Sequence, residues 1–397
     1  MKDWPKVKLA DVAERCLGKM LDARKNKGRL MPYLRNPNVR WFDVDTSELQ
    51  SMPFEDREQE RYGLKAGDIV ICEGGEAGRA AIWDGRLPDL KFQKAIHRVR
   101  PGPRLHNRYF VHQLMADHQA GRLGDYLTGA TIKHFTGQDL ARYMFPLPPL
   151  AEQRRIAEVL DRAEALRDKR RAALAQLDSL TQSLFLDLFG DPKSNLKAWP
   201  QKAMAELFAT SPIFGTMIPP VAEKRGWLSL RVGNIQDWSL DLSDQKYVEL
   251  PSASRERHSV KDGDLLLARA IASQDHLGKC VIAHPNGEQW AFDSHLMRLR
   301  FDLKHTEPEF IRHLFMTPGG RSIFLRASRK STVQFNINTK EMSALQIPVP
   351  PIELQREFAR RVTAVEKLKT AQRASLAELD ALFATLQHRA FRGELRV

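Results

Sequence analysis

Two stretches of the chain carry apolar residues at alternating steps of three and four, a pattern that predicts two long amphipathic helices. The a/d positions of the first are Val159, Ala163, Leu166, Arg170, Ala173, Leu177, Leu180 and Leu184. Those of the second lie 202 residues later, at Arg361, Val365, Leu368, Gln372, Ser375, Leu379, Leu382 and Leu386. We expect the two helices to pack on each other, with Arg170 and Gln372 as polar residues that set the register.

Each predicted helix follows a proline-rich hinge, because proline fixes extended backbone and permits a helix to start directly after it. The first helix is predicted to end at Gly190 and Pro192. Leu174 and Leu376 widen the apolar stripes beyond a strict seam, which indicates a partner protein's helices. A purely intramolecular coil is the alternative.

The blocks before the two hinges combine strand and helix signals. Residues 68–72 and 264–268 are apolar runs that follow a Gly-Asp turn, as strands do. Residues 107–117 and 308–317 have the pattern of short helices, and the glycines at 74, 75 and 78 are typical of turns. The chain is therefore expected to be an α+β protein, with two mixed α/β domains and two long helices.

The sequence also repeats itself once, with a period near 200 residues. Trp-Pro at 4–5 recurs at 199–200, and Lys-Ala-Gly-Asp at 65–68 recurs as Lys-Asp-Gly-Asp at 261–264. Pro-Leu-Pro-Pro-Leu-Ala-Glu-Gln-Arg at 146–154 recurs as Pro-Val-Pro-Pro-Ile-Glu-Leu-Gln-Arg at 348–356. Matches in the same order predict an internal repeat. The expected boundaries are 1–145 (first domain), 146–191 (first helical region), 192–347 (second domain) and 348–397 (second helical region).

The charge of the chain points to a polyanionic partner, because the net charge is +13 and the pI is about 9.7. Residues 1–150 carry 25 Lys and Arg against 19 Asp and Glu, and residues 192–351 carry 21 against 16. The first helical region, 151–191, carries 7 against 8. Most of the excess thus lies in the two domains, each of which is separately basic.

Other features exclude several protein classes. The N-terminus does not resemble a signal peptide, and no apolar run approaches the roughly 20 residues that span a bilayer. Cys16, Cys72 and Cys280 lie far apart without Cys-x-x-Cys spacing, as expected for small buried side chains in a reducing compartment. We expect a cytoplasmic protein with no membrane partner.

No known catalytic pattern is present. The chain has no Glu-x-Lys, no Asn-Pro-Pro-aromatic, no Walker sequence and no Gly-x-Ser-x-Gly. The twelve histidines are scattered and do not have metal-ligand spacing. We therefore expect no catalytic residue and no metal site.

The doubled hinge-and-helix motif resembles the two conserved regions of the specificity subunits of type I restriction-modification enzymes. One departure is that Glu353, Leu354 and Gln355 stand where the first copy has Ala151, Glu152 and Gln153. The resemblance implies two target-recognition domains at opposite ends of an antiparallel helical coil, arranged as a pseudo-two-fold repeat. Each domain would read one half of a split, asymmetric site in double-stranded DNA.

The resemblance also implies partners. Two modification subunits would dock around the helices and bring S-adenosylmethionine, and restriction (motor-nuclease) subunits would bring ATP and magnesium. This chain would bind none of these cofactors. A stand-alone bivalent DNA-binding regulator, or an enzyme with an unfamiliar site, is the alternative.

Polar residues near the predicted loops are the candidates for DNA contact. They are Arg35, Arg79, Lys133 and His134 in the first domain, and Arg231, Gln274, Arg329, Lys330, Gln334, Asn336 and Asn338 in the second. Candidates for the coiled-coil and partner interface are Gln153, Leu166, Leu177, Leu184, Gln355, Leu368, Leu379 and Leu386.

Overall fold

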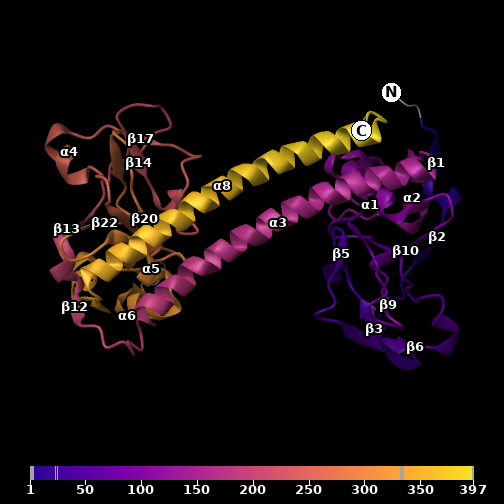
Figure 1. Ribbon diagram of the computed structural model, residues 1–397, viewed down its shortest axis with the longest axis horizontal. Helices are drawn as coiled ribbons and strands as arrows, with labels where there is room; N and C mark the ends of the chain where they lie inside the picture. The colour runs from indigo at the N-terminus through magenta and orange to yellow at the C-terminus, as the bar shows by residue number, and fades with distance from the viewer. Residues whose placement is uncertain (1–3, 23, 25, 331–334, 396–397) are drawn as a thin grey trace. The chain divides into compact units, whose positions relative to one another are not determined.

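The computed structural model describes residues 4–22, 24, 26–330 and 335–395. They fall into two units. Unit 1 comprises the described residues of Met1–Arg171 and Ala374–Val397, and unit 2 comprises those of Ala172–Arg373. The boundaries between the units lie inside the two long helices, α3 and α8 in Figure 1.

Both long helices are present, as the apolar spacing predicts. α3 (Leu150–Phe189) and α8 (Ile352–Phe391) contain 40 residues each, which corresponds to about 60 Å of α-helix at about 1.5 Å per residue. α3 begins directly after Pro149 and ends at Phe189, where Gly190 adopts a φ of 75°. Glycine tolerates this left-handed conformation, so the predicted stop is confirmed.

Unit 1 is built on a four-stranded antiparallel sheet of order β2-β10-β7-β8. Its strands are β2 (Ala13–Leu17), β10 (Ile96–Pro101), β7 (Ile69–Cys72) and β8 (Ala80–Ile82). A second sheet has the order β6-β3-β9, and two strand pairs complete the unit. These strands are β6 (Gln50–Phe54), β3 (Arg29–Leu34), β9 (Lys91–Phe92), β4 (Val39–Arg40) with β5 (Asp43–Val44), and β1 (Lys6–Lys8) with β11 (Met144–Pro146). Its short helices are α1 (Asn107–Gln119) and α2 (Gly137–Arg142).

Unit 2 repeats this plan with the sheets β13-β22-β18-β20 and β17-β14-β21. The strands are β13 (Phe208–Phe214), β22 (Leu296–Phe301), β18 (Leu265–Ala268), β20 (Cys280–Ile282), β17 (Tyr247–Val248), β14 (Trp227–Leu230) and β21 (Trp290–Phe292). The strand pairs are β15 (Ile235–Gln236) with β16 (Ser239–Leu240), and β12 (Gln201–Ala203) with β25 (Gln346–Pro348).

Unit 2 also contains a small sheet of order β19-β24-β23, formed by β19 (Ala270–Ile271), β24 (Phe335–Asn336) and β23 (Arg329–Lys330). Its helices are α4 (Ser252–His258), α5 (Pro308–Met316), α6 (Pro318–Ala327) and α7 (Thr339–Ala344). The mixed strand and helix content expected from the sequence is thus present in both units, and α1 and α5 lie where short helices are predicted.

The repeated Lys-x-Gly-Asp turn has the same structure in both units. The carboxylate of Asp68 accepts the backbone N–H of Lys65 at 2.8 Å and binds the guanidinium of Arg100 at 2.7 and 2.8 Å. In unit 2, Asp264 accepts the N–H of Lys261 at 2.7 Å and binds Arg300 at 2.6 Å through both of its oxygens. Each buried carboxylate is thus paired and hydrogen-bonded, as burial of a charge requires. The turn therefore fixes where β7 and β18 begin.

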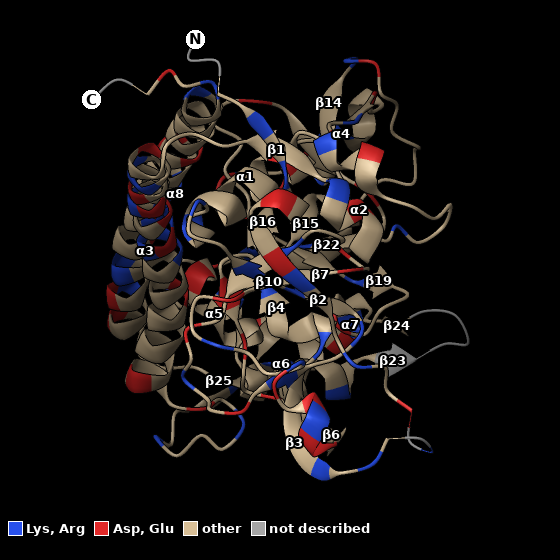
Figure 2. Ribbon diagram, turned by 90° about the vertical axis from the view of Figure 1, so that its right-hand side faces the viewer, with Lys and Arg blue, Asp and Glu red and all other residues tan. Residues whose placement is uncertain are grey.

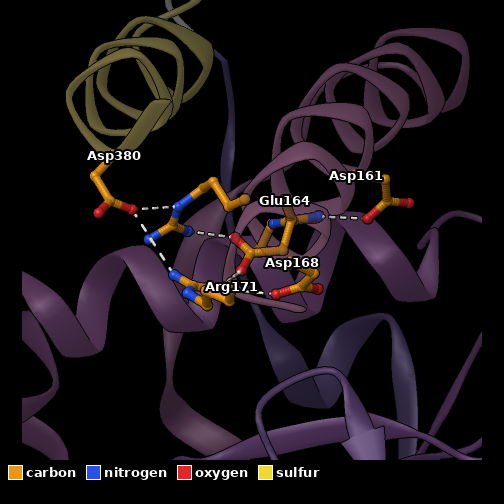
Figure 3. Close-up of polar contacts among 7 residues, drawn as sticks. Asp161, Glu164, Asp168, Arg171 and Asp380 are labelled. Carbon is orange, nitrogen blue, oxygen red and sulfur yellow. Dashed lines mark hydrogen bonds and ion pairs between the residues drawn. The ribbon is translucent and has the colours of Figure 1, made fainter. Parts of the chain in front are cut away.

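In unit 1, the first half of α3 packs against the last half of α8. Arg167 on α3 donates to Asp380 on α8 at 2.6 Å, pairs with Glu164, and lies 4.5 Å above the ring of Phe383. Figure 3 shows the polar contacts of this cluster, in which Arg171 also reaches Asp380 at 3.7 Å. Since residue 155 contacts Leu395 while residue 167 contacts Asp380, the two segments run antiparallel.

In unit 2, the last half of α3 packs against the first half of α8. Lys369 on α8 contacts Asp178 on α3 at 2.9 Å. Further along, Phe185 and Phe189 pack on Phe358 with ring centroids 5.5 and 5.3 Å apart. These segments also run antiparallel, and their contact is largely aromatic.

The predicted seam is partly wrong. Four of its leucines are about half exposed: Leu166 (49%), Leu180 (43%), Leu368 (54%) and Leu382 (48%). The fully buried stripe lies beside it and includes polar residues such as Gln153 and Thr181. A count of apolar residues omits such positions, so it shifts the predicted seam toward the edge of the buried face.

Candidate nucleic-acid interface

Each hinge is fastened to its own unit by one buried glutamine. In unit 1, Oε1 of Gln153 accepts the N–H of His106 at 2.8 Å, and its Nε2 donates to the carbonyls of Arg104 and Pro148 at 2.9 and 2.8 Å. The amide group thus joins the start of α3 to the segment that precedes α1. The side chain is 0% exposed, so its expected place at a partner interface is incorrect.

Gln355 performs the same function in unit 2. Its Oε1 accepts the N–H of Glu307 at 3.0 Å, and its Nε2 donates to Pro350 at 2.8 Å and to His305 at 3.5 Å. It is also 0% exposed, and the same correction applies. Each glutamine therefore ties the start of its long helix to the fold of its own unit.

Several of the candidate residues in unit 1 lie together at the end of β7. His134 pairs with Thr128 across a short hairpin, with N–H···O distances of 2.8 and 2.9 Å. Its ring lies against Gly74, where an added Cβ would come within 3.1 Å of Nδ1. The Gly74 carbonyl accepts the side-chain N–H of Asn36 at 2.6 Å, and Asn36 in turn accepts from Arg79. Loops far apart in the sequence thus meet at one place.

The four candidates of this unit differ in how free they are to contact DNA. Lys133 and His134 are exposed on the hairpin. Arg79 is held by Glu76 at 3.0 Å and by Asn36 at 2.8 Å, so part of its guanidinium is engaged within the fold. Arg35 is half-buried, and its Nε has no hydrogen-bond partner among the described residues. All four remain predictions as DNA contacts.

In unit 2 the corresponding hairpin is the small sheet β19-β24-β23. Arg329 pairs with Asn336 and Lys330 with Phe335, while β24 pairs on its other side with Ala270 and Ile271. Three candidates, Arg329, Lys330 and Asn336, therefore share one sheet. Gln334 lies outside the described residues.

The remaining candidates of unit 2 are placed differently. Gln274 is exposed on the loop after β19. The guanidinium of Arg231 binds the side chain and the carbonyl of Asp244, both at 2.9 Å. Asn338 caps α7, because its Oδ1 accepts the backbone N–H of Glu341 at 2.9 Å. The carboxylate of Glu341 in turn accepts the backbone N–H of Asn338. Much of the hydrogen-bonding capacity of Arg231 and Asn338 is therefore used within the fold.

Sequence reasoning missed a pair of oppositely charged residues at equivalent positions. Glu73 follows β7 and Arg269 follows β18. The carbonyl of Glu73 accepts the N–H of Phe135 at 2.6 Å, and that of Arg269 accepts the N–H of Ile337 at 3.0 Å. Extending the repeat alignment five residues past the Lys-x-Gly-Asp turn would have found them.

The surface of the helices is not uniformly basic. Figure 2 shows Lys and Arg interspersed with Asp and Glu along both α3 and α8. Residues 151–191 carry 7 basic against 8 acidic residues. A phosphate backbone is attracted by an excess of positive charge, so α3 is a poor candidate for the main DNA contact, and residues 1–150 and 192–351, each with a net positive charge, are better ones.

The exposed leucines have a regular arrangement. Leu166 and Leu180 on α3 correspond to Leu368 and Leu382 on α8 at an offset of 202. The other four predicted interface leucines are half-buried: Leu177, Leu184, Leu379 and Leu386. Both helices thus have leucine side chains that the described residues leave about half exposed.

The three cysteines are free thiols. Cys72 and Cys280 are buried, and burial raises the pKa of their thiols to about 11 and about 12. Cys16 is half-buried. Over the described part of the chain, no group of three or more His, Cys, Asp and Glu side chains is placed to hold a metal ion. Nor do the described residues include a helix with the length and apolar character needed to cross a membrane.

Comparison with known proteins gives consistent matches. The family model described as type I restriction modification DNA specificity domain matches residues 1–176 and 239–380. The type I restriction enzyme EcoKI specificity subunit of Escherichia coli K12 is 24% identical over 388 residues, which are 93% of this chain and 83% of the relative. The StySPI specificity subunit of Salmonella potsdam is 24% identical over 382 residues, 92% of this chain and 82% of the relative.

Two solved structures share the fold. The S subunit of a type I restriction-modification system from M. genitalium superposes with a TM-score of 0.60 at 15% identity, covering 98% of this chain and 96% of that one. A chain from a structure on complex assembly and conformational transition of a type I R-M system gives 0.59 at 19% identity, with 100% and 99% covered.

Proposed function

The chain belongs to the type I restriction-modification DNA specificity family, and we propose that each of its two units reads one half of a bipartite, asymmetric DNA site. In this proposal residues 1–145 and 192–347 are the target-recognition domains, and residues 146–191 and 348–397 are the helical regions. The alternative of a stand-alone regulator is not favoured, because the family match extends over both repeats.

One observation carries the proposal: the two units share their internal anchors and differ where loops meet solvent. Gln153 and Gln355 make the same three kinds of backbone contact, and Asp68 and Asp264 bind equivalent arginines. The loops after β7 and β18 differ in length, charge and secondary structure. A shared frame with unlike surfaces is what two readers of unlike half-sites need.

We further propose that α3 and α8 form an antiparallel coiled coil with pseudo-two-fold symmetry. The antiparallel contacts of Arg167 with Asp380 and of Lys369 with Asp178 support this arrangement. The leucine edge at residues 166, 180, 368 and 382 is then the docking surface for two modification subunits, because exposed leucines at repeated positions favour a helical partner. Restriction subunits would join the same assembly.

Catalysis in this proposal belongs to the partners. They would supply adenine-specific methyl transfer with S-adenosylmethionine, and cleavage with ATP and magnesium. This chain would select the site in the cytoplasm and contribute no catalytic residue and no cofactor site.

Exchange of one block tests the two-reader proposal. Residues 1–145 are replaced by the equivalent block of a relative, and the methylated motif is read by sequencing the genome of a host that also carries the modification gene. We expect one half-site to change and the other to persist, and the reciprocal exchange of residues 192–347 to do the opposite. A chimera that alters both half-sites together contradicts the proposal.

A variant pair tests the docking surface. Leu166→Glu combined with Leu368→Glu should abolish assembly with modification subunits while leaving the fold intact, because both side chains are half exposed. Arg162→Glu with Thr363→Glu, at exposed positions of the same helices, is the matched control. Normal assembly of the leucine variant in size-exclusion chromatography would exclude this edge as the docking site.

A further inference from the structure

The residue that follows the third strand of the main sheet has opposite charge in the two units. Glu73 occupies this place in unit 1 and Arg269 in unit 2. Both are fixed by their backbones: the N–H of Glu73 donates to Ala95 and that of Arg269 donates to His295, each at 2.9 Å. The two side chains therefore start from equivalent backbone positions.

Arg269 is supported by an aromatic ring and by no polar partner. Its guanidinium carbon lies 4.0 Å from the ring centroid of Phe214 on β13. Nε is buried and donates to no partner, and across the described residues its guanidinium makes no hydrogen bond and no ion pair. Asp293 is the acidic group near it, and burial raises the pKa of that carboxyl.

Other buried arginines of unit 2 are bound within the fold. Arg300 makes a bidentate pair with Asp264 at 2.6 Å, and Arg298 donates to the carbonyls of Arg257 and Ser259 at 3.0 and 2.6 Å. Arg269 is half-buried, and burial lowers its pKa, yet it gains no such compensation. The ring of Phe214 holds its guanidinium, but the described residues supply it with no hydrogen-bond acceptor, which points to a ligand outside the chain.

The surroundings of Arg269 suit a nucleic acid. The next residue begins β19, whose partner β24 contains Asn336 and pairs with Arg329 and Lys330 on β23. The small sheet that begins next to Arg269 therefore contains two further basic residues, Arg329 and Lys330. An arginine stacked on an aromatic ring has a fixed guanidinium plane, so less entropy is lost when it forms a two-pronged hydrogen bond.

We propose that Arg269 reads a guanine in the half-site of unit 2, through paired hydrogen bonds to its O6 and N7. The inference rests on the proposed function. Glu73 at the equivalent place cannot donate to those atoms, but its carboxylate can accept from N4 of cytosine. The two half-sites therefore differ in base identity at the position that this residue reads.

The experiment uses the chain assembled with its modification subunits and a library of sites with both half-sites randomised. Arg269→Gln should change the preference at one position of one half-site from guanine to adenine, because glutamine pairs with adenine N6 and N7. Discrimination for guanine at that position should fall roughly 5- to 150-fold. Arg257→Gln, which removes the same charge from an exposed site on α4, should leave every base preference unchanged.

Two outcomes would overturn the inference, and a third would refute the proposed function on which it rests. Unchanged base preference in Arg269→Gln excludes a reading role, and equal weakening on all sequences makes Arg269 a phosphate contact. A wild-type assembly without sequence preference would instead refute the proposed function. Hydrogen exchange in β18 and β22 checks that the variant is folded. Glu73→Gln gives a second measurement in unit 1, where it should alter the other half-site only.

Discussion

The last halves of α3 and α8 occupy equivalent places in the two units but are packed by different chemistry. In unit 2, Phe185 is fully buried and its ring stacks on Phe310 at 5.7 Å. In unit 1 the equivalent residue is Gln387, whose buried Nε2 has no hydrogen-bond partner among the described residues. One end of the helix pair is thus filled with aromatic rings, and the other contains an amide.

The inter-helix ion pairs differ in the same direction. Unit 1 uses Arg167, which binds Asp380 and covers the ring of Phe383. Unit 2 uses Lys369, which binds Asp178 as a point charge. An arginine makes a planar contact through several donors, which a lysine cannot do. The helix contact of unit 1, which contains the buried amide, therefore also has the more directional ion pair.

What does not differ is the set of groups that bind the backbone. Gln153 and Gln355, and likewise Asp68 and Asp264, make equivalent bonds in both units. Volume in a core can be filled in several ways, whereas a particular N–H or carbonyl needs a partner at one place. The repeat therefore preserves the polar anchors more strictly than the hydrophobic packing.

The largest difference between the two units should follow from removing the buried aromatic ring of Phe185 in unit 2. Phe185→Ala should destabilise that unit by about 3–5 kcal/mol, since it deletes a fully buried ring and leaves a cavity. Hydrogen exchange resolved by peptide measures each unit separately. Leu186→Ala, at the neighbouring partly exposed position, is the control and should cost much less. Equal effects of the two variants would show that the ring cluster is not the main source of packing.

The anchors should give the next largest effect, and a slightly unequal one. Gln153→Ala leaves one N–H and two carbonyls without their partner and should destabilise unit 1 by about 2–4 kcal/mol. Gln355→Ala should cost less, because its bond to His305 is 3.5 Å long. Exchange protection near the starts of α1 and α5 reports the losses, with exposed Gln176→Ala as the control. A larger loss in the Gln355 variant would contradict the geometric argument.

Acid should distinguish His313 of unit 2 from His112 of unit 1, two of the buried histidines. Burial lowers the pKa of His313 to about 3, and Arg312 and Lys369 act in the same direction. The unfolded chain takes up this proton near pH 6.5 and the folded unit does not. The stability that neutral His313 contributes is therefore present above about pH 6.5 and falls by about 1.4 kcal/mol per pH unit toward pH 3.

His112 in unit 1 should respond less steeply. Burial also lowers its pKa, but the carboxylate of Asp161, 2.8 Å from Nε2, opposes the shift. Between pH 7 and pH 5, the pH dependence of the free energy of unfolding should therefore flatten more in His313→Gln than in His112→Gln. Identical slopes in the wild type and the His313 variant would mean that this histidine is already solvated.

The smallest expected effect has the opposite sign. Gln387→Leu removes a buried donor that lacks a partner and should stabilise unit 1 by about 1 kcal/mol. Gln182→Leu, an exposed position of α3, controls for the general effect of a leucine on helix stability. Destabilisation by Gln387→Leu would show that the amide is solvated or bonded in solution.

Much of the architecture could be predicted from local sequence. The hinge prolines and Gly190 set the ends of α3, and the Lys-x-Gly-Asp turns precede β7 and β18 as expected. These features depend on residues close together in the chain, so their backbone conformations follow from local sterics. The doubled hinge also identified the family, which the family match confirms.

The candidate site could be predicted only in part. The sequence selected Arg79 and Asn338 as polar loop residues, but it could not show that Asn36 holds the first or that the second caps a helix. His134 and Gly74 are 60 residues apart in the sequence, and they lie side by side only because the hairpin folds back on β7. Arg269 was missed for the same reason, because its guanidinium packs on Phe214, which lies on a strand distant in the sequence.

The sequence by itself therefore determined that this protein has two related domains, two hinges and two long helices, since each depends on periodicity or on short-range turns. The tertiary structure alone decided which side of each helix is buried. Gln153 and Lys369 lie on that side because partners from other segments satisfy their polar groups, and leucines at positions such as 166 and 368 remain exposed. These polar groups are buried where a distant segment supplies their hydrogen bonds, and no local pattern records where that segment lies.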